Sequence, residues 1–230
     1  MFYAFKVMMT SSITLAMALT AADANARSSA YEEKERHPHH AMKSVLDTTS
    51  VTAYANGLID SMLNVFNNPK LSHEKKREDY QKIMLENMAV SEVTDFVLGI
   101  YKRDMDRNQR TRFENVFSRY LAQSYSSIID SISGNVTASL RGVQRYTSDR
   151  YVANVEIVAP ATDMGTIRMG YVVMMNDRGE LKIGDIVFEG VNYLNMYRAQ
   201  VKSALTYRSV RITNEKIDEM IDQFQASLGG

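Results

Sequence analysis

The stretch YVANVEIVA at residues 151–159, followed by IRMGYVVMM at residues 167–175, decides the fold. Apolar side chains take alternate positions in both stretches, which is the period of a half-buried β-strand. The alternation begins at Val136, and the turn NDRG at residues 176–179 leads into a return strand over residues 181–188. Four sequential strands joined by turns predict an antiparallel meander.

The residues on either side of this sheet show the helical period instead. Apolar residues recur every three or four positions, which predicts helices over residues 51–66, 72–87, 93–101, 106–134, 191–205 and from 213 to 224. Asp106 and Gln109 have the spacing of a capping box at the start of the longest one. The order of helices, sheet and helices predicts an α+β fold, with helices packed on one face of a curved four-stranded antiparallel sheet.

The N-terminus has the three parts of a secretory signal peptide. A short segment with Lys6 is followed by an apolar stretch over residues 7–22 and an A-x-A site ending at Ala26. We therefore expect residues 1–26 to be a cleaved signal peptide and residues 27–43 to be a flexible polar leader. Residues 44–230 would form a single domain, and the compartment would be the periplasm.

Composition excludes several kinds of chemistry. Lysine plus arginine equals aspartate plus glutamate at 27 each, so no overall charge attracts the chain to nucleic acid. The chain has no cysteine, which excludes disulfides, thiolate zinc sites and cysteine nucleophiles.

The four histidines do not suggest a metal site or a catalytic base. His37, His39 and His40 lie in the predicted leader, where no rigid structure would orient them as ligands. His73 falls at the start of a predicted helix, facing solvent. We therefore expect no metal site, no cofactor and no catalytic residues, and we interpret the chain as a protein that is not an enzyme.

Charged residues within the predicted domain are interpreted as ordinary surface. Three strand carboxylates are the only candidates for acid–base chemistry, and we expect them to be solvated or ion-paired: Glu156, Asp185 and Glu189. A basic cluster around the start of the long helix fits either a headgroup or partner contact or a solvated mixed-charge face, and the second is favoured: Lys102, Arg103, Arg107, Arg110 and Arg112.

The chain has 15 methionines and 13 tyrosines but no tryptophan. Met169, Met174 and Met175 are expected on the apolar face of the sheet. Methionine adapts to irregular or variable contents, yet it is also an ordinary core residue, and the pattern alone favours the core.

Two blocks of sequence resemble the MlaC family of periplasmic phospholipid-transport proteins. The first is VLGIY at residues 97–101 with NQRTRF at residues 108–113, continued by Phe117, Leu121 and Tyr125. The second is more specific, with GDIVFEGV at residues 184–191 leading to YRAQ at residues 197–200. The resemblance extends over nearly the whole predicted domain.

The resemblance implies an NTF2-like curved sheet enclosed by helices around an apolar cavity that holds phospholipid acyl chains. It also implies a shuttle that carries lipid between an outer-membrane lipoprotein complex and an inner-membrane ABC transporter, as part of outer-membrane lipid asymmetry. Three alternatives stay open: a hopanoid-associated carrier of the same family, an NTF2-like small-molecule enzyme, and a structural module with a filled core.

Under the carrier interpretation, the cavity is lined by the apolar face of the sheet and by the helices laid across it. The expected lipid-binding residues are Val97, Tyr101, Phe113, Phe117, Ile157, Met169, Val173, Phe188, Val191 and Tyr197. Their alternative is a solid core.

Overall fold

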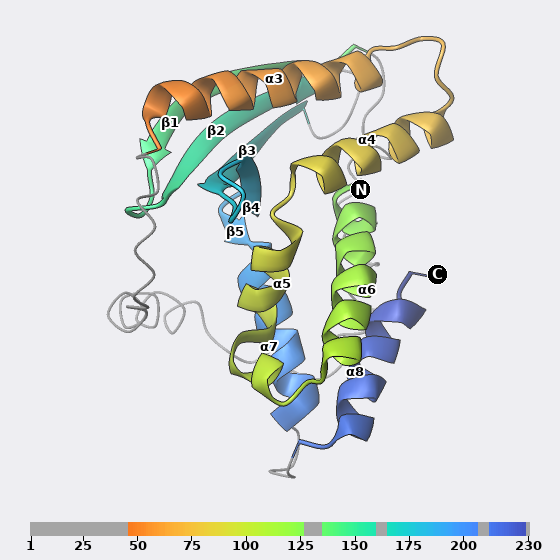
Figure 1. Ribbon diagram of the computed structural model, residues 1–230. Coiled ribbons are helices and arrows are strands. Elements are labelled where there is room, and N and C mark those ends of the chain that lie inside the picture. Colours follow the sequence, from red (N-terminus) through yellow and green to blue (C-terminus); the bar gives the residue numbers. More distant parts are fainter. Residues whose placement is uncertain (1–45, 127–134, 160–164, 207–211, 229–230) are drawn as a thin grey trace. The chain divides into compact units, whose positions relative to one another are not determined.

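The computed structural model describes residues 46–126, 135–159, 165–206 and 212–228 (Figure 1). The predicted signal peptide and leader, and the end of the long helix after residue 126, lie outside these ranges. Within these ranges, no helix combines the length and the apolar character that crossing a bilayer requires.

Three of the helices that precede the sheet begin after residues whose side chains cap them, Asp47, Ser72 and Asp106, whereas the helix after Ala89 has no side-chain cap. Ser72 Oγ accepts the Lys75 N–H at 3.2 Å, so the second helix begins as predicted. The third helix begins three residues earlier than predicted, and from Gly99 (φ 55°) the chain continues as a 3₁₀ turn. These elements are α3 (Thr48–Phe66), α4 (His73–Asn87), α5 (Val90–Leu98), η1 (Gly99–Arg103) and α6 (Arg107–Ser126).

The predicted capping box at the start of α6 is confirmed. The Gln109 N–H donates to Asp106 Oδ1 at 2.8 Å, and the Asp106 N–H donates to Gln109 Oε1 at 3.2 Å. Gln109 Nε2 also donates to the Asn214 carbonyl at 3.2 Å. The same side chain therefore caps α6 and ties it to the start of the last helix.

The sheet has five antiparallel strands in sequential order, not the predicted four. They are β1 (Thr137–Arg145), β2 (Arg150–Ala159), β3 (Gly165–Met175), β4 (Leu181–Phe188) and β5 (Val191–Asn192). The prediction of helix from residue 191 was wrong because β5 is only two residues long, too short to show a period. Glu189 (φ 46°) and Gly190 (φ 82°) make the tight turn before it, and Gly190 can adopt that conformation without strain.

Two further helices complete the fold, α7 (Tyr193–Thr206) and α8 (Asn214–Ala226). Helix α3 lies along β1 and β2, whereas α5 and α7 contact the sheet at β4 (Figure 1). Helix α6 packs on α4, α5 and α8. The inward-facing residues of the strands and the buried faces of the helices form one apolar core. The predicted α+β class is confirmed, and the comparison with NTF2-like folds stays a prediction.

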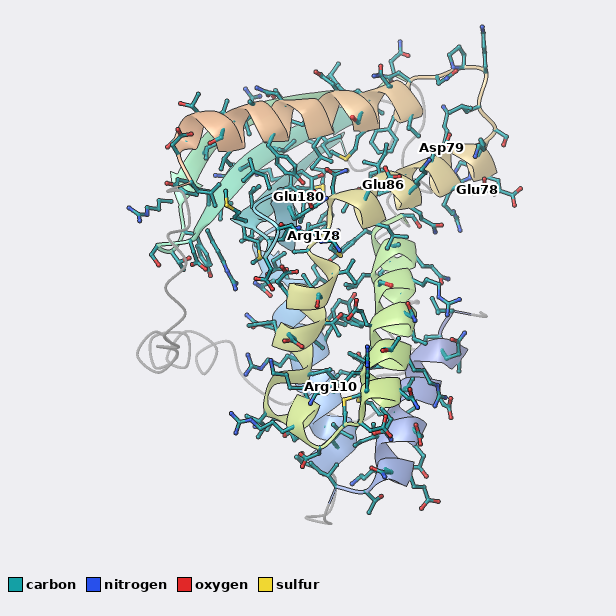
Figure 2. The ribbon with its side chains drawn as sticks, in the orientation of Figure 1. Glu78, Asp79, Glu86, Arg110, Arg178 and Glu180 are labelled. Atoms are coloured by element: carbon teal, nitrogen blue, oxygen red, sulfur yellow. The ribbon has the colours of Figure 1, made fainter. Side chains whose placement is uncertain are left out.

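Several charged residues of α4 lie on its outer side and pair with one another. Glu78, Asp79 and Glu86 are distributed along it (Figure 2). Lys75 pairs with Glu78 at 3.1 Å and with Asp79 at 2.9 Å, and these are exposed pairs within one helix.

Candidate functional site

Aromatic rings from three helices pack together in the interior. Phe113 and Phe117 of α6 stack with their centroids 5.2 Å apart. Phe117 also meets Tyr197 of α7 edge-to-face at 5.6 Å and Phe224 of α8 at 5.7 Å. Tyr120 closes the group, 5.5 Å from Tyr197 and 5.2 Å from Phe224. These five residues, called the aromatic cluster below, fix how α6, α7 and α8 meet.

The sheet side of the interior is aliphatic and sulfur-rich. Met169 and Tyr171 lie on the same face of β3, and the Tyr171 hydroxyl donates to Met62 Sδ at 3.6 Å and to Met169 Sδ at 3.8 Å. Ile157 of β2 pairs in register with Ile167, and Val173 is fully buried in the middle of the sheet. Both sulfurs are weak acceptors, so this surface offers adaptable apolar contacts with little polarity. It is called the sheet wall below and consists of Ile157, Met169, Tyr171 and Val173.

The methionines of β3 do not all share this face. Met174 pairs in register with Arg150 and Lys182 and so points to the opposite side from Met169. There Gly184 leaves it room, since a Cβ on that glycine would lie only 2.6 Å from the Met174 sulfur. The expectation of three methionines on the apolar face was therefore wrong for Met174.

The other predicted lipid-binding residues lie at different depths. Val97 of α5 and Tyr101 of η1 are buried in the same core as the aromatic cluster and the sheet wall. Phe188 is half-buried and packs against that core. Val191 is 52% exposed, because it lies on the short edge strand β5. The structure thus places nine of the predicted residues in or against one continuous core and leaves Val191 at the surface.

Three tyrosines in this interior are absent from the predicted lipid-binding set, Tyr80, Tyr125 and Tyr171. Burial raises the pKa of each phenol well above its ordinary value, so all three hydroxyls are neutral donors. The Tyr125 hydroxyl is buried and finds no hydrogen-bond partner among the described residues. An apolar period does not distinguish a buried tyrosine from a surface one, although Tyr125 is part of the first family motif.

The strand carboxylates divide into two kinds. Glu156 forms an ion pair with Arg141, as predicted. Glu189 Oε1 accepts the Arg168 N–H at 2.9 Å on the surface. Asp185 is only 6% exposed, and burial raises the pKa of its carboxyl to about 7. The expectation that Asp185 is solvated or ion-paired was wrong.

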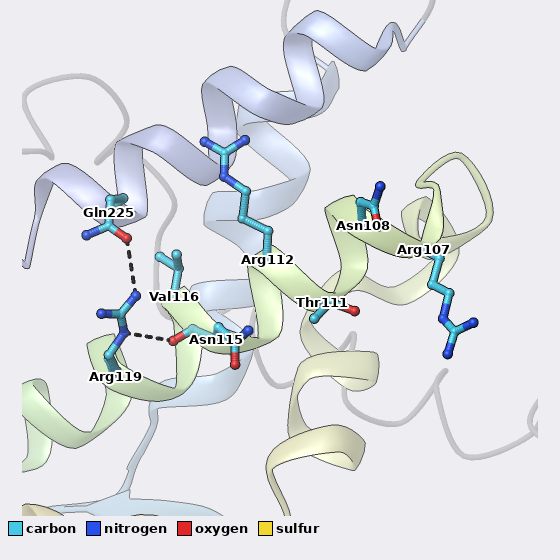
Figure 3. Close-up of a pocket in the computed structure, with 8 residues that line it drawn as sticks. All are labelled: Arg107, Asn108, Thr111, Arg112, Asn115, Val116, Arg119 and Gln225. Atoms are coloured by element: carbon cyan, nitrogen blue, oxygen red, sulfur yellow. Dashed lines mark hydrogen bonds between the residues drawn. The ribbon is translucent and has the colours of Figure 1, made fainter.

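A surface pocket of about 440 Å³ lies along α6 and α8 (Figure 3). Arg119 spans it, donating to the Asn115 carbonyl at 3.1 Å and to Gln225 Oε1 at 3.4 Å. Arg112 on the same helix pairs with Asp218 at 3.0 Å and with Asp222.

The basic cluster at the start of α6 is consistent with the solvated-face interpretation. Arg112 has acidic partners, and Lys102 pairs with Asp95 at 2.7 Å. Arg110 lies in the first turns of α6 (Figure 2) and is exposed. Within the described ranges, no group of three or more side chains could hold a metal ion. The three leader histidines lie outside those ranges.

Comparison with solved structures finds a protein with a similar fold. The phospholipid-binding protein from Ralstonia solanacearum, solved in complex with a phospholipid, superposes with a TM-score of 0.62 at 15% sequence identity. The match includes 77% of this chain and 98% of that one. This similarity shows that the two proteins share an α+β fold.

Sequence comparison then gives the family. Residues 56–226 match the MlaC protein family, and the chain belongs to it. The resemblance drawn from the two sequence motifs is therefore confirmed. No curated protein matches this chain at the sequence level.

Proposed function

We propose that this protein binds a phospholipid by its acyl chains, between the sheet wall and the aromatic cluster. The observation that carries the proposal is the combination of MlaC family membership with one continuous apolar interior, which contains eight of the ten predicted residues and has Phe188 packed against it. The similar fold of a protein solved with phospholipid supports it.

The energetics favour an enclosed lipid over a free one. Each buried methylene contributes about 0.8 kcal/mol, so an acyl chain of about 16 carbons contributes on the order of 10 kcal/mol. In the structure Phe117 and Val173 are fully buried by protein neighbours. A lipid therefore enters only if the walls separate, and the acyl chains must replace the contacts that the walls lose.

The contacts between the helices and the sheet support an opening at β4. Helices α5 and α7 contact the sheet at β4, and the aromatic cluster belongs to α6, α7 and α8. Displacing α5 and α7 from β4 would open the interior without breaking the hydrogen bonds between neighbouring strands from β1 to β4. Methionine and aliphatic walls select poorly among acyl chains, so the bound lipids should vary in length and unsaturation.

We further propose that the protein is exported to the periplasm and shuttles lipid between an outer-membrane lipoprotein complex and an inner-membrane ABC transporter. Family membership and the signal-peptide pattern at residues 1–26 support this role. We propose a carrier rather than an enzyme, because a carrier needs only enclosure and release of its cargo.

Organic extraction of protein purified without detergent, followed by mass spectrometry, tests the proposal. We expect phospholipid at about one molecule per chain, because an opening between apolar walls is costly to leave empty or filled with water. An exported protein of unrelated fold, purified identically, controls for carry-over. Hopanoid in place of phospholipid would favour the hopanoid-associated carrier. Well-folded protein that yields no lipid would contradict the proposal and favour a structural module.

A further inference from the structure

Asp185 of β4 is a carboxylate in an unusual position. It pairs in register with Val172 and therefore points away from the face that carries Tyr171 and Ile186. Strand alternation would place such a residue in solvent, yet Asp185 is 6% exposed and Val172 is 3% exposed. A buried carboxylate is stable only where hydrogen bonds replace its water.

Those hydrogen bonds connect the sheet to α7. Asp185 Oδ1 accepts the Ile186 N–H at 2.7 Å, and Oδ2 accepts from Asn192 Nδ2. Asn192 uses its other side-chain atom, Oδ1, to accept the Asn195 N–H at 2.9 Å, so it caps the first turn of α7. The backbone of Leu194, in the first turn of α7, also favours the charged form of Asp185. The carboxylate thus lies against the N-terminal end of α7, where backbone N–H groups favour an anion.

We propose that Asp185 is a positioning residue, which holds the start of α7 against β4 through Asn192 and so controls the separation of the interior walls. The inference rests on the proposed lipid-binding function. Tyr197 lies one turn beyond this attachment and contacts Phe117 at 5.6 Å. Any movement of the α7 start relative to β4 therefore moves a member of the aromatic cluster relative to the sheet wall.

The protonation of Asp185 makes this attachment sensitive to pH. Burial raises its pKa from 3.8 to about 7, while hydrogen bonds from Ile186 and Asn192 and the charge of Arg150 on β2 oppose the rise. Among the residues that the structure describes, Tyr125 of α6 and Tyr197 of α7 also interact with the charge of Asp185, and both are neutral phenols with raised pKa.

The sign of the pH effect follows from the raised pKa. A carboxyl with a higher pKa in the folded state stabilises the fold at low pH, and this stability is lost as pH rises from about 4 to about 7. Above pH 7 the ionised carboxylate favours arrangements in which water reaches it. The attachment of α7 should therefore weaken as the pH rises through neutrality.

The first test compares the pH dependence of unfolding in the full exported chain after lipid removal. Between pH 5.5 and 8.5 the wild-type unfolding constant should rise about thirtyfold more than that of Asp185→Asn, given a folded pKa of about 7. Glu156→Gln is the matched control, because Glu156 of β2 is a carboxylate on the same outer face of the sheet as Asp185 and pairs with Arg141. It should keep the wild-type difference. Asp185→Asn with an unchanged pH difference, or Glu156→Gln with an equal loss, would overturn the proposal.

The second test addresses position rather than charge. Asn192→Ala removes the link, so amide-exchange protection should fall at least tenfold in α7 relative to α8, the internal control. Equal changes in the two helices would overturn the positioning role. Neither the unfolding measurement nor the amide-exchange measurement needs lipid. A failure to find lipid in the extract would therefore refute the proposed function and leave both measurements interpretable. If both measurements give the expected results, lipid retention should be lower at pH 8.5 than at pH 5.5, and the decrease should be smaller in Asp185→Asn.

Discussion

Truncating Phe117 should be among the most destabilising single changes in this protein. Its ring is fully buried and has four aromatic neighbours, with centroids between 5.2 and 6.5 Å. Replacing a buried phenylalanine by alanine costs about 3–5 kcal/mol through lost transfer energy and the cavity left behind. We expect Phe117→Ala in lipid-stripped protein to lose about 4 kcal/mol, or roughly 10 °C in melting temperature for a domain of this size.

Urea unfolding followed by tyrosine fluorescence and circular dichroism measures this loss. Ile100→Ala is the control, because Ile100 is 67% exposed and its truncation should change stability by no more than about 0.5 kcal/mol. The loss for Phe117→Ala should be smaller in lipid-loaded protein, since an acyl chain can fill the vacated volume. A loss below about 1 kcal/mol without lipid would refute the reasoning, because it would mean that the aromatic cluster is not packed.

Two further predictions follow from local observations. Asn67, at the C-terminal end of α3, fixes the entry to β1 by donating to the Val136 carbonyl and accepting the Val136 N–H, both at 2.8 Å. Asn67→Ala should therefore cost about 1–2 kcal/mol in urea unfolding, while Asn64→Ala, at an exposed position of α3, should be nearly neutral. N-terminal sequencing of protein from the periplasmic fraction should begin at Arg27, after the A-x-A site, and a chain that retains residue 1 would contradict export by cleavage.

The elements set by local chemistry were predictable from the sequence. The turn NDRG and the alternation after it predicted β4 with its observed bounds, residues 181–188. The capping box of Asp106 and Gln109 was equally readable, because its two hydrogen bonds join residues three apart. Both cases depend on neighbours in the chain.

The features that depend on tertiary contacts were not predictable. The alternation of strand residues correctly assigns Asp185 to the outer face of the sheet. Asp185 is nevertheless buried, because the start of α7 covers it, and no sequence pattern predicts that α7 packs against β4. The list of lining residues meets the same limit. Phe117 and Met169 have the same periodicity whether they fill a core or face a lipid, so the sequence locates the apolar interior without telling which of its members contact cargo.

The position of an acyl chain in the lipid-loaded protein is the most direct test of the proposed binding site. Met169 and Met174 are on opposite faces of the same strand, so their ¹³C-labelled methyl groups report on the interior and on the outer face of the sheet. The protein would be loaded with a phospholipid that carries a nitroxide near the end of one acyl chain. If the acyl chain lies between the sheet wall and the aromatic cluster, the nitroxide should broaden the Met169 methyl signal strongly and the Met174 signal much less, each compared with its signal after the nitroxide is reduced. Equal broadening of the two, or stronger broadening of Met174, would contradict binding between the sheet wall and the aromatic cluster.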